Sequence, residues 1–360
     1  MSNLINQIHQ SPKKFVLALT GGGSKALTEL LSVPGASATV LDASIPYHPE
    51  ALETYLGQGV ETAASSLTAR NLAMAAWLRA CAINKSQENV VGVGATCALT
   101  TNRRRLGNNR CFIAIQTSSR TEEIKVVLDE GVRTRQGEEN LVSDLIIHQI
   151  AECCGLQTPR LEFPEKIVRR CHDASENWSR LLTGKQKTTL SSPHSINLFP
   201  GAFNPLHQGH EEIIAYSEKL LQGKVYLEVS IDNVDKLPID FLTMQDRQEQ
   251  LNGKSLIYTN APTFIEKARL FPECCFILGV DTLLRIINKK YYDNEALLAS
   301  SIEEIYELGC KMLVFGRNVN GHFLTLDNLT LPGNVKRLCM GVNEEDFRND
   351  VSSTLLREHE

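Results

Sequence analysis

The chain has 360 residues, of which 42% are hydrophobic and 22% are charged, and its formal net charge is −5. This length suggests two domains of about 100–200 residues each, and the ordinary composition excludes a disordered or fibrous protein. No run of about 18 apolar residues occurs, which argues against a transmembrane helix. The N-terminus lacks the apolar core of a secretory signal, so we expect an intracellular, cytoplasmic protein.

The cysteines and the charge distribution disfavour several classes of ligand. Two adjacent pairs occur among the ten cysteines but no CxxC, so they predict neither a zinc site nor a disulfide framework. The acidic excess lies in residues 195–360, and the one basic run is the three arginines at 103–105. Proteins that bind nucleic acid normally carry a basic face. We therefore expect neither nucleic acid nor a membrane as a partner.

The first 155 residues alternate strand and helix patterns. An apolar run at its start leads into the glycine turn Gly21–Gly23, as a strand does before a tight turn. Apolar periodicity predicts strands at 15–19 and 111–116 and helices at 24–31, 62–83 and 138–154. Alternating elements of this kind predict a three-layer α/β domain over residues 1–155.

Residues 156–194 have a weaker pattern. A basic stretch that we interpret as helical follows Pro159, and a polar run ends at Pro193. Polar stretches rich in Lys, Thr and Ser are typical of linkers. We therefore predict a linker over 156–194 and a second domain over 195–360, which opens with a strand at 196–199.

A phosphate-binding turn is predicted directly after that strand. The segment GAFNPLHQGH spans residues 201–210 and leads into a helix at 211–221. A helix start offers free N–H groups and the positive end of its dipole to a phosphate. His207 and His210 are three residues apart, so both side chains can face this point. The same spacing could hold a metal ion, but no third ligand is adjacent, and phosphate binding is favoured.

A second hydroxyl-rich cluster lies near the C-terminus, at Ser352, Ser353, Thr354 and Arg357. Any one of these hydroxyls could simply cap a helix. Three consecutive hydroxyls followed by an arginine one turn later also suit a polyphosphate, because a guanidinium donates two parallel hydrogen bonds to phosphate oxygens.

These two motifs resemble the GxFxPxHxGH and SSTxxR signatures of the nucleotidylyltransferase superfamily, which has a Rossmann-like fold. Between them, the strand ending in Gly279 and Asp281 and the late strand ending in Arg317 are also similar to the family pattern. The segment Lys289–Tyr292 resembles nicotinamide mononucleotide adenylyltransferases. Asn204 stands where the family often has aspartate.

The resemblance implies transfer of AMP or CMP to a phosphate group with release of pyrophosphate, with Mg²⁺ bound to ATP and no metal held by protein side chains. His207, His210 and Arg357 would be catalytic. The implied nucleotide-binding residues are Gly201, Ala202, Phe203, Asn204, Gly279, Asp281, Arg317, Ser352, Ser353 and Thr354.

The acceptor is indicated by fewer residues. Lys236 is a candidate for the mononucleotide phosphate, and Tyr291 is a candidate to stack on a nicotinamide ring, although adjacent tyrosines are more often packing residues. We expect ATP-dependent adenylyl transfer to nicotinamide or nicotinate mononucleotide, a reaction of NAD biosynthesis. The alternatives are a cytidylyl or pantetheine-phosphate enzyme, or a non-catalytic nucleotide-binding regulator.

Residues 15–155 resemble the CinA C-terminal domain, which has the fold of nicotinamide mononucleotide deamidases. The family reads E-S-C-T-G-G at its nucleophile, whereas this chain has Thr20, Gly22 and Ser24 there. Leu52 stands where the family has the activating lysine, and leucine cannot accept a proton from a hydroxyl. We expect a degenerate domain without amidase activity, whose glycine turn still suits a mononucleotide phosphate and which serves regulation or homo-oligomer formation.

Overall fold

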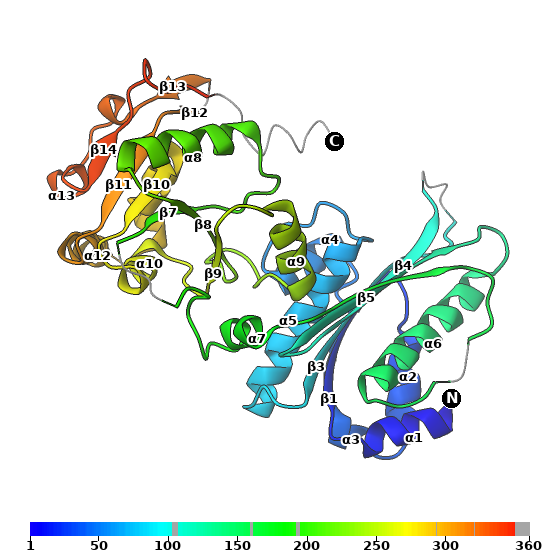
Figure 1. Cartoon of the computed structure of the whole chain (residues 1–360). Coiled ribbons are helices and arrows are strands. Elements are labelled where there is room, and N and C mark those ends of the chain that lie inside the picture. Colours follow the sequence, from blue (N-terminus) through cyan, green and yellow to red (C-terminus); the bar gives the residue numbers. More distant parts are fainter. Residues whose placement is uncertain (103–106, 159–160, 192–194, 293, 320, 350–360) are drawn as a thin grey trace. The chain divides into compact units, whose positions relative to one another are not determined.

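The computed structural model describes residues 1–102, 107–158, 161–191, 195–292, 294–319 and 321–349. The arginine run at 103–105 and the C-terminal motif with Ser352, Ser353, Thr354 and Arg357 lie outside these residues. By their contacts, the residues form two compact units (Figure 1). The first comprises Met1–Thr183 and Asp235–Gln245, and the second comprises Gly184–Val234 and the residues from Asp246 on. None of the described helices is long and apolar enough to cross a membrane.

The first unit is built on one six-stranded sheet. Its strands are β1 (Lys14–Thr20), β2 (Val40–Ser44), β3 (Val90–Ala98), β4 (Asn109–Gln116), β5 (Arg120–Leu128) and β6 (Ile167–Asp173). Their order in space is β2-β1-β3-β4-β5-β6. The pairs of β1 with β2 and with β3 are parallel, whereas β3 to β6 are successively antiparallel.

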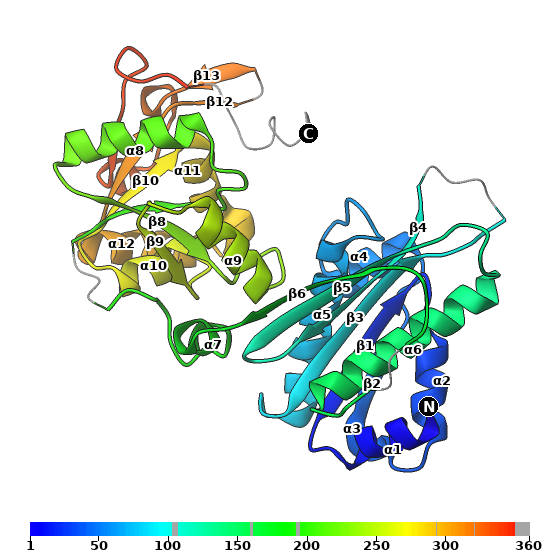
Figure 2. The same cartoon turned by 45° about the vertical axis from the view of Figure 1, so that its right-hand side comes forward.

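Helices cover both faces of this sheet, so the expected three-layer α/β architecture is confirmed. The helices are α1 (Ser2–Gln10), α2 (Lys25–Ser32), α3 (Ala36–Thr39), α4 (Pro49–Leu56), α5 (Ser66–Asn84), α6 (Arg135–Cys153) and α7 (Glu176–Leu182). Figure 2 shows α5 on one face and α1, α2 and α6 on the other. The main core, which contains Phe15, Ile113 and Ile146, lies under α1, α2 and α6.

Small residues bring α5 unusually close to the sheet. Ser65 caps the helix by accepting a hydrogen bond from the Thr68 N–H. A Cβ atom at Gly92 would lie 2.0 Å from the carbonyl oxygen of Ala73, and one at Gly94 would lie 2.2 Å from that of Ala69. Only glycine fits such an approach of two backbones. The alanines of the predicted helix and the glycines of β3 therefore together allow this close packing.

The predicted linker is largely structured. Part of the basic stretch after Pro159, which we expected to be helical, forms the edge strand β6, and α7 follows it. Four consecutive residues of β6 are exposed, and Arg169 forms ion pairs with Glu122 and Glu152. An edge strand with charged side chains on both faces lacks the alternation by which strands are recognised. For this reason the sequence pattern indicated a linker where the structure has a sheet edge.

The second unit contains a parallel sheet. Its strands are β7 (Asn197–Pro200), β8 (Val225–Ser230), β9 (Leu256–Thr259), β10 (Cys275–Gly279), β11 (Lys311–Phe315) and β14 (Cys339–Gly341), with the separate hairpin β12 (Arg317–Val319) and β13 (His322–Leu324). The order is β9-β8-β7-β10-β11-β14, and every pair in it is parallel. This is the doubly wound order of Rossmann-like folds, as expected.

The helices connect successive strands of this sheet. They are α8 (Gln208–Leu221), α9 (Phe241–Gln250), α10 (Phe264–Leu270), α11 (Val280–Ile286), α12 (Glu295–Glu307) and α13 (Gly333–Lys336), with the 3-10 turns η1 (Lys289–Tyr291) and η2 (Leu326–Asn328). In both views α8 lies over one face of the sheet and α10 and α12 over the other. The chain leaves β7 toward β8 on one side and later returns to β10 on the other. Ligands of such sheets bind at the carboxyl ends of the strands beside this reversal.

Candidate nucleotide-binding site

The predicted phosphate-binding turn lies at the reversal point of the parallel sheet. The chain leaves the carboxyl end of β7 at Pro200 and enters α8 at Gln208. His207 is the N-cap residue of α8, with extended backbone. The two histidines therefore lie at the positive end of a 14-residue helix, where free N–H groups and the helix dipole favour an anion.

A backbone hydrogen bond sets the orientation of His210. Its Nδ1 accepts from the His207 backbone N–H at 3.3 Å. Because Nδ1 is then the acceptor of the neutral ring, the proton is assigned to Nε2. Among the described residues, His210 therefore has one nitrogen bonded at the helix start, and its Nε2–H has no hydrogen bond.

Aromatic rings surround His210. The His207 ring stacks on it with centroids 3.6 Å apart, and the rings of Phe203 and Phe199 meet it edge-on at 5.2 and 5.9 Å. Burial, and to a smaller extent the charge of Arg317 and the neighbouring His207, lower the pKa of His210 to about 3. Burial and Arg317 also lower the pKa of His207. Both imidazoles are thus neutral hydrogen-bond donors at neutral pH.

His207 also presents a polar atom that lacks a partner. The residue is 9% exposed, and within the described part of the chain its buried Nδ1 has no hydrogen bond. Buried nitrogens are normally paired, because an unsatisfied one costs about 1–3 kcal/mol. An oxygen-rich ligand at the helix start would provide the missing partner.

The next two strands bring Gly279, Asp281 and Arg317 together. A Cβ atom at Gly279 would lie 2.4 Å from Asp281 Oδ1 and 2.9 Å from Arg317 Cγ. Burial lowers the pKa of Arg317, and the charge of Asp281 opposes that effect. The charge of Arg317 also lowers the pKa of both imidazoles. The carboxyl ends of β7, β10 and β11 therefore form one site.

The last described residues lie against the start of α8. Asn349 donates a hydrogen bond to Glu212 Oε2 at 2.6 Å, and a Cβ atom at Gly209 would lie 2.7 Å from the Asn349 side-chain oxygen. The Phe347 ring packs on Tyr216 of α8 and Phe315 of β11, with centroids 5.8 and 5.0 Å away. The sequence of the hydroxyl-rich motif follows three residues later.

The other predicted nucleotide-binding residues occupy the same turn, with different exposure. Gly201, Ala202 and Asn204 are exposed, whereas Phe203 is buried and packs on His210. Phe203 therefore contributes to the site by packing on His210 and not through a polar group.

The two predicted acceptor residues belong to different units. Lys236 is exposed and belongs to the first unit. Tyr291 lies in η1, and its side chain is outside the description. The Tyr292 hydroxyl donates to the Ile286 carbonyl at 2.9 Å, which is a packing role. The described residues include no cluster of three or more His, Cys, Asp or Glu side chains that could hold a metal ion.

In the first unit, a carboxylate fills the glycine turn that we expected to suit a phosphate. Glu139 of α6 accepts hydrogen bonds from the Gly23 N–H at 3.0 Å, the Ser24 hydroxyl at 3.0 Å and the Lys25 N–H at 3.2 Å. The Glu139 carboxylate thus already occupies the position of an anion at the start of α2. Thr20 donates to the Pro46 carbonyl at 2.9 Å.

Two residues of the predicted degenerate site have other surroundings. Leu52 is 3% exposed and packs as a core residue. A Cβ atom at Gly22 would lie 2.5 Å from Leu99 Cδ1 and 3.2 Å from Glu139 Oε2. Sequence reasoning missed Glu139, since the turn and this residue are more than 100 residues apart and no local signal pairs them.

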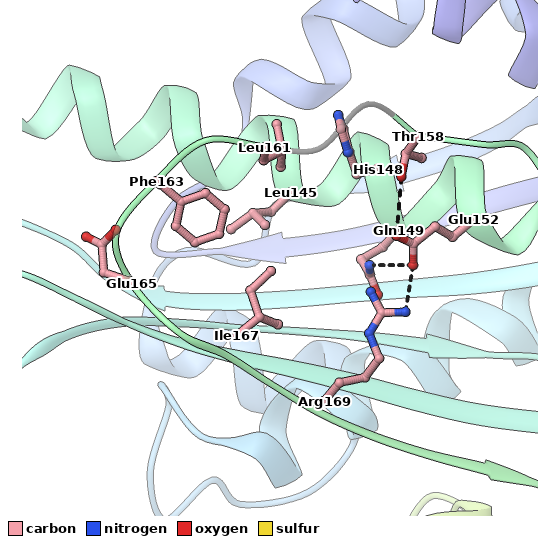
Figure 3. A pocket seen from close by; sticks show the side chains of 10 residues that line it. All are labelled: Leu145, His148, Gln149, Glu152, Thr158, Leu161, Phe163, Glu165, Ile167 and Arg169. Atoms are coloured by element: carbon pink, nitrogen blue, oxygen red, sulfur yellow. Dashed lines mark hydrogen bonds and ion pairs between the residues drawn. The ribbon is translucent and has the colours of Figure 1, made fainter.

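A cavity of about 340 Å³ lies elsewhere in this unit, between α6 and the segment before β6 (Figure 3). Leu145, Leu161, Phe163 and Ile167 line its apolar part. At its polar end Glu152 already accepts from Gln149 and Arg169. Three polar side chains of this cavity, Gln149, Glu152 and Arg169, are therefore paired with one another.

The chain is similar to several known proteins. Residues 198–359 match the family model described as cytidylyltransferase-like. Solved structures similar to the N-terminal part include a competence/damage-inducible protein of Agrobacterium tumefaciens (17% identity, TM-score 0.32, covering 43% of this chain and 91% of that chain). Another is a CinA superfamily protein of Klebsiella pneumoniae (8% identity, TM-score 0.36, 43% and 94% covered).

A curated relative is the phosphopantetheine adenylyltransferase of Mycoplasma capricolum, which is 32% identical over 120 residues. The match covers 31% of this chain and 82% of that relative. Through its C-terminal part, the chain therefore belongs to the cytidylyltransferase-like family of nucleotidylyltransferases.

Proposed function

We propose that this nucleotidylyltransferase moves the adenylyl group of ATP to nicotinamide or nicotinate mononucleotide. The observation that supports the transfer chemistry is the pair of neutral histidines at the start of α8, beside the reversal point of the sheet. The charge of Arg317 is near enough to lower the pKa of both. Neutral imidazole donors, helix N–H groups and a guanidinium together suit a triphosphate.

In the proposed reaction, a phosphate oxygen of the acceptor attacks the α-phosphorus of ATP. A bond from that oxygen to phosphorus forms, the bond to the β-phosphate bridge breaks, and pyrophosphate leaves with the electron pair. His210 Nε2–H donates to an α-phosphate oxygen, where negative charge increases in the transition state. Catalysis is then positioning and charge stabilisation without a covalent enzyme intermediate.

The remaining charge of ATP is met by other groups. His207 and the helix N–H groups bind adjacent phosphate oxygens, while Arg317, fixed near Asp281, adds a positive charge. Mg²⁺ bound to the triphosphate would supply further charge neutralisation. We also propose that Ser352, Ser353, Thr354 and Arg357 bind the β- and γ-phosphates. This is supported by the hydrogen bond that Asn349, three residues before the motif, donates to Glu212 of α8.

Nicotinamide specificity is the finer part of the proposal. It is supported by the resemblance of Lys289–Tyr292 to the corresponding segment of nicotinamide mononucleotide adenylyltransferases, and by the resemblance of residues 15–155 to a deamidase of the same mononucleotide. The second candidate acceptor is phosphopantetheine, because the curated relative carries that name.

The decisive experiment supplies Mg²⁺ with ATP or CTP to the full chain and follows pyrophosphate. Nicotinamide mononucleotide, nicotinate mononucleotide and phosphopantetheine are each tested as acceptor, and the dinucleotide product is identified by mass. Activity with CTP alone, or with phosphopantetheine alone, would refute the nicotinamide proposal. No pyrophosphate from any pair would favour a nucleotide-binding regulator.

We propose further that the first unit is not an amidase. Glu139 fills the glycine turn, and Leu52 provides no base. Release of ammonia from nicotinamide mononucleotide by the full chain would contradict this.

A further inference from the structure

A buried ion pair lies in the strand next to the phosphate-binding turn, and the proposed reaction uses neither of its members. Lys267 Nζ of α10 lies 2.6 Å from Glu228 Oε1 of β8, and these side chains are 5% and 1% exposed. The same carboxylate oxygen accepts a hydrogen bond from the Thr259 hydroxyl of β9. A buried ion pair is often no more stabilising than apolar residues of similar volume. Stability alone therefore does not account for charged groups at this position.

The carboxylate of Glu228 is held from two other elements. Lys267 also donates from Nζ to the Ala261 carbonyl at 2.7 Å, in the segment between β9 and α10. Thr259 is the last residue of β9 and is fully buried. Because both donors to the carboxylate have fixed positions of their own, the carboxylate fixes β8 relative to β9 and α10.

The main chain of Glu228 contacts the phosphate-binding turn directly. Glu228 pairs with Pro200, the last residue of β7, and its carbonyl accepts a hydrogen bond from the Gly201 N–H at 3.0 Å. Proline has no N–H of its own to donate. The Gly201 N–H is therefore the donor that attaches the first residue of the turn to β8.

Within the turn, packing contacts continue from Gly201 to His210. A Cβ atom at Gly201 would lie 2.8 Å from Phe203 Cζ, so the ring of Phe203 packs against the Gly201 backbone. The same ring meets His210 edge-on, with centroids 5.2 Å apart. Phe203 has a φ of 46°, which is uncommon for a bulky residue and persists only where the surrounding structure holds it. The position of the His210 ring therefore depends on that of Gly201.

We propose that the buried pair of Lys267 and Glu228 holds the phosphate-binding turn in place, so that both are positioning residues for His210. Neither touches a substrate, and both act through the Gly201 N–H and the Phe203 ring. Every contact in this path lies within the second unit. A misplacement of about 1 Å at a reacting group can lower a rate about 10²-fold, so the pair influences the transfer step from a distance. This inference rests on the function proposed above.

The first test compares Lys267→Met with Arg269→Met in the full chain. Arg269 also lies in α10, but its ion pair with Glu304 is on the surface. Loss of Lys267 leaves the Glu228 carboxylate buried without its cation, whereas loss of Arg269 leaves a carboxylate in water. Single-turnover pyrophosphate release is measured, because its rate constant reports the chemical step and its amplitude reports the fraction of folded chains.

We expect the rate constant of Lys267→Met to fall about two- to thirtyfold, the range for residues that influence a site without touching it. The amplitude should equal the folded fraction measured by circular dichroism, and the KM for the acceptor should stay within about twofold. Arg269→Met should match the wild type. Lys267→Met combined with Glu228→Gln should recover part of the rate, because glutamine is uncharged and can still accept from the Thr259 hydroxyl.

A second readout needs no nucleotide. In chains with isotope-labelled glycine, the amide proton of Gly201 should move upfield in Lys267→Met, because its hydrogen bond to the Glu228 carbonyl weakens. Thr259→Val removes only a hydroxyl, so it should give a smaller shift and a smaller fall in rate, and it decides the test if Lys267→Met does not fold. Thr259→Ser keeps the hydroxyl and should match the wild type. The amide of Gly341 in β14, at the far edge of the sheet, should not move in any variant.

The outcomes separate this inference from the proposed function. A lower amplitude with an unchanged rate constant in Lys267→Met would show that the pair only stabilises the fold, and would overturn the positioning role. An unchanged Gly201 signal in both Lys267→Met and Thr259→Val would also overturn it. If the wild type releases no pyrophosphate with any acceptor, the proposed function is refuted, whereas a shifted Gly201 signal would still support the hold of the pair on the turn.

Discussion

Replacing His210 separates its proposed role in catalysis from its role at the helix start. His210→Asn keeps an oxygen that can accept from the His207 N–H, as Nδ1 does at 3.3 Å, but it removes the Nε2 donor. His210→Ala removes both functions and the edge-on contacts with Phe199 and Phe203.

The magnitudes follow from these two roles. Loss of one preorganised donor to a developing negative charge typically lowers kcat about 10²- to 10³-fold, so we expect this loss in both variants. Asparagine should cost about 1 kcal/mol or less of stability, because the capping hydrogen bond remains. Alanine should cost about 1–3 kcal/mol, since it removes that bond and the ring packing.

The assay pairs single-turnover pyrophosphate release with urea unfolding of the same samples. His207→Asn gives a comparison at the neighbouring ring. If His210→Asn retains turnover within about threefold of the wild type, the assignment of Nε2–H to the α-phosphate is refuted. If instead both variants lose activity only in proportion to the unfolded fraction, His210 is structural.

Three further predictions concern the second unit. The pKa of His210 is about 3 in the folded chain and about 6.5 when unfolded, so the unfolded state binds more protons between these values and stability falls as pH decreases from 6.5. Between pH 6 and pH 5 the wild type should lose about 1 kcal/mol more than His210→Asn in urea unfolding, and equal losses would contradict this. Gly279→Ala places a Cβ 2.4 Å from Asp281 Oδ1, so the KM for ATP should rise about tenfold or more with the fold retained by circular dichroism; an unchanged KM would remove Gly279 from the site. Lys267 lies 2.6 Å from Glu228, with both side chains at most 5% exposed, so Lys267→Met should cost about 3–5 kcal/mol in urea unfolding. Lys267→Met combined with Glu228→Gln should recover part of that loss, and a loss below 1 kcal/mol in the single variant would refute the buried pair.

The contiguous features of this protein could be predicted from the sequence. The apolar run before Gly21, the alanine-rich helix that became α5 and the strand–turn–helix around His207 and His210 each lie within about 20 residues. Local periodicity, turn residues and helix-start chemistry specify such elements directly. The helix at 211–221 was placed within three residues of α8 (Gln208–Leu221).

The failures have a common physical origin. β6 lies in the stretch that was predicted as a basic helix within a linker, because charged residues such as Arg169 gain their partners from the distant elements β5 and α6. The glycine turn gave no sign that Glu139 fills it. In each case the partner lies in a distant part of the chain, and a local pattern does not identify a distant partner.

By itself, the sequence determined two α/β domains, the family of the second and the histidine pair at a helix start. Only the tertiary structure decided the neutral state of His210, which depends on the rings packed around it. It also decided the attachment of Asp240 to Arg70, which are 170 residues apart. Burial and ion pairing over such separations arise from packing of the whole chain, and packing is the part of the structure that no single segment encodes.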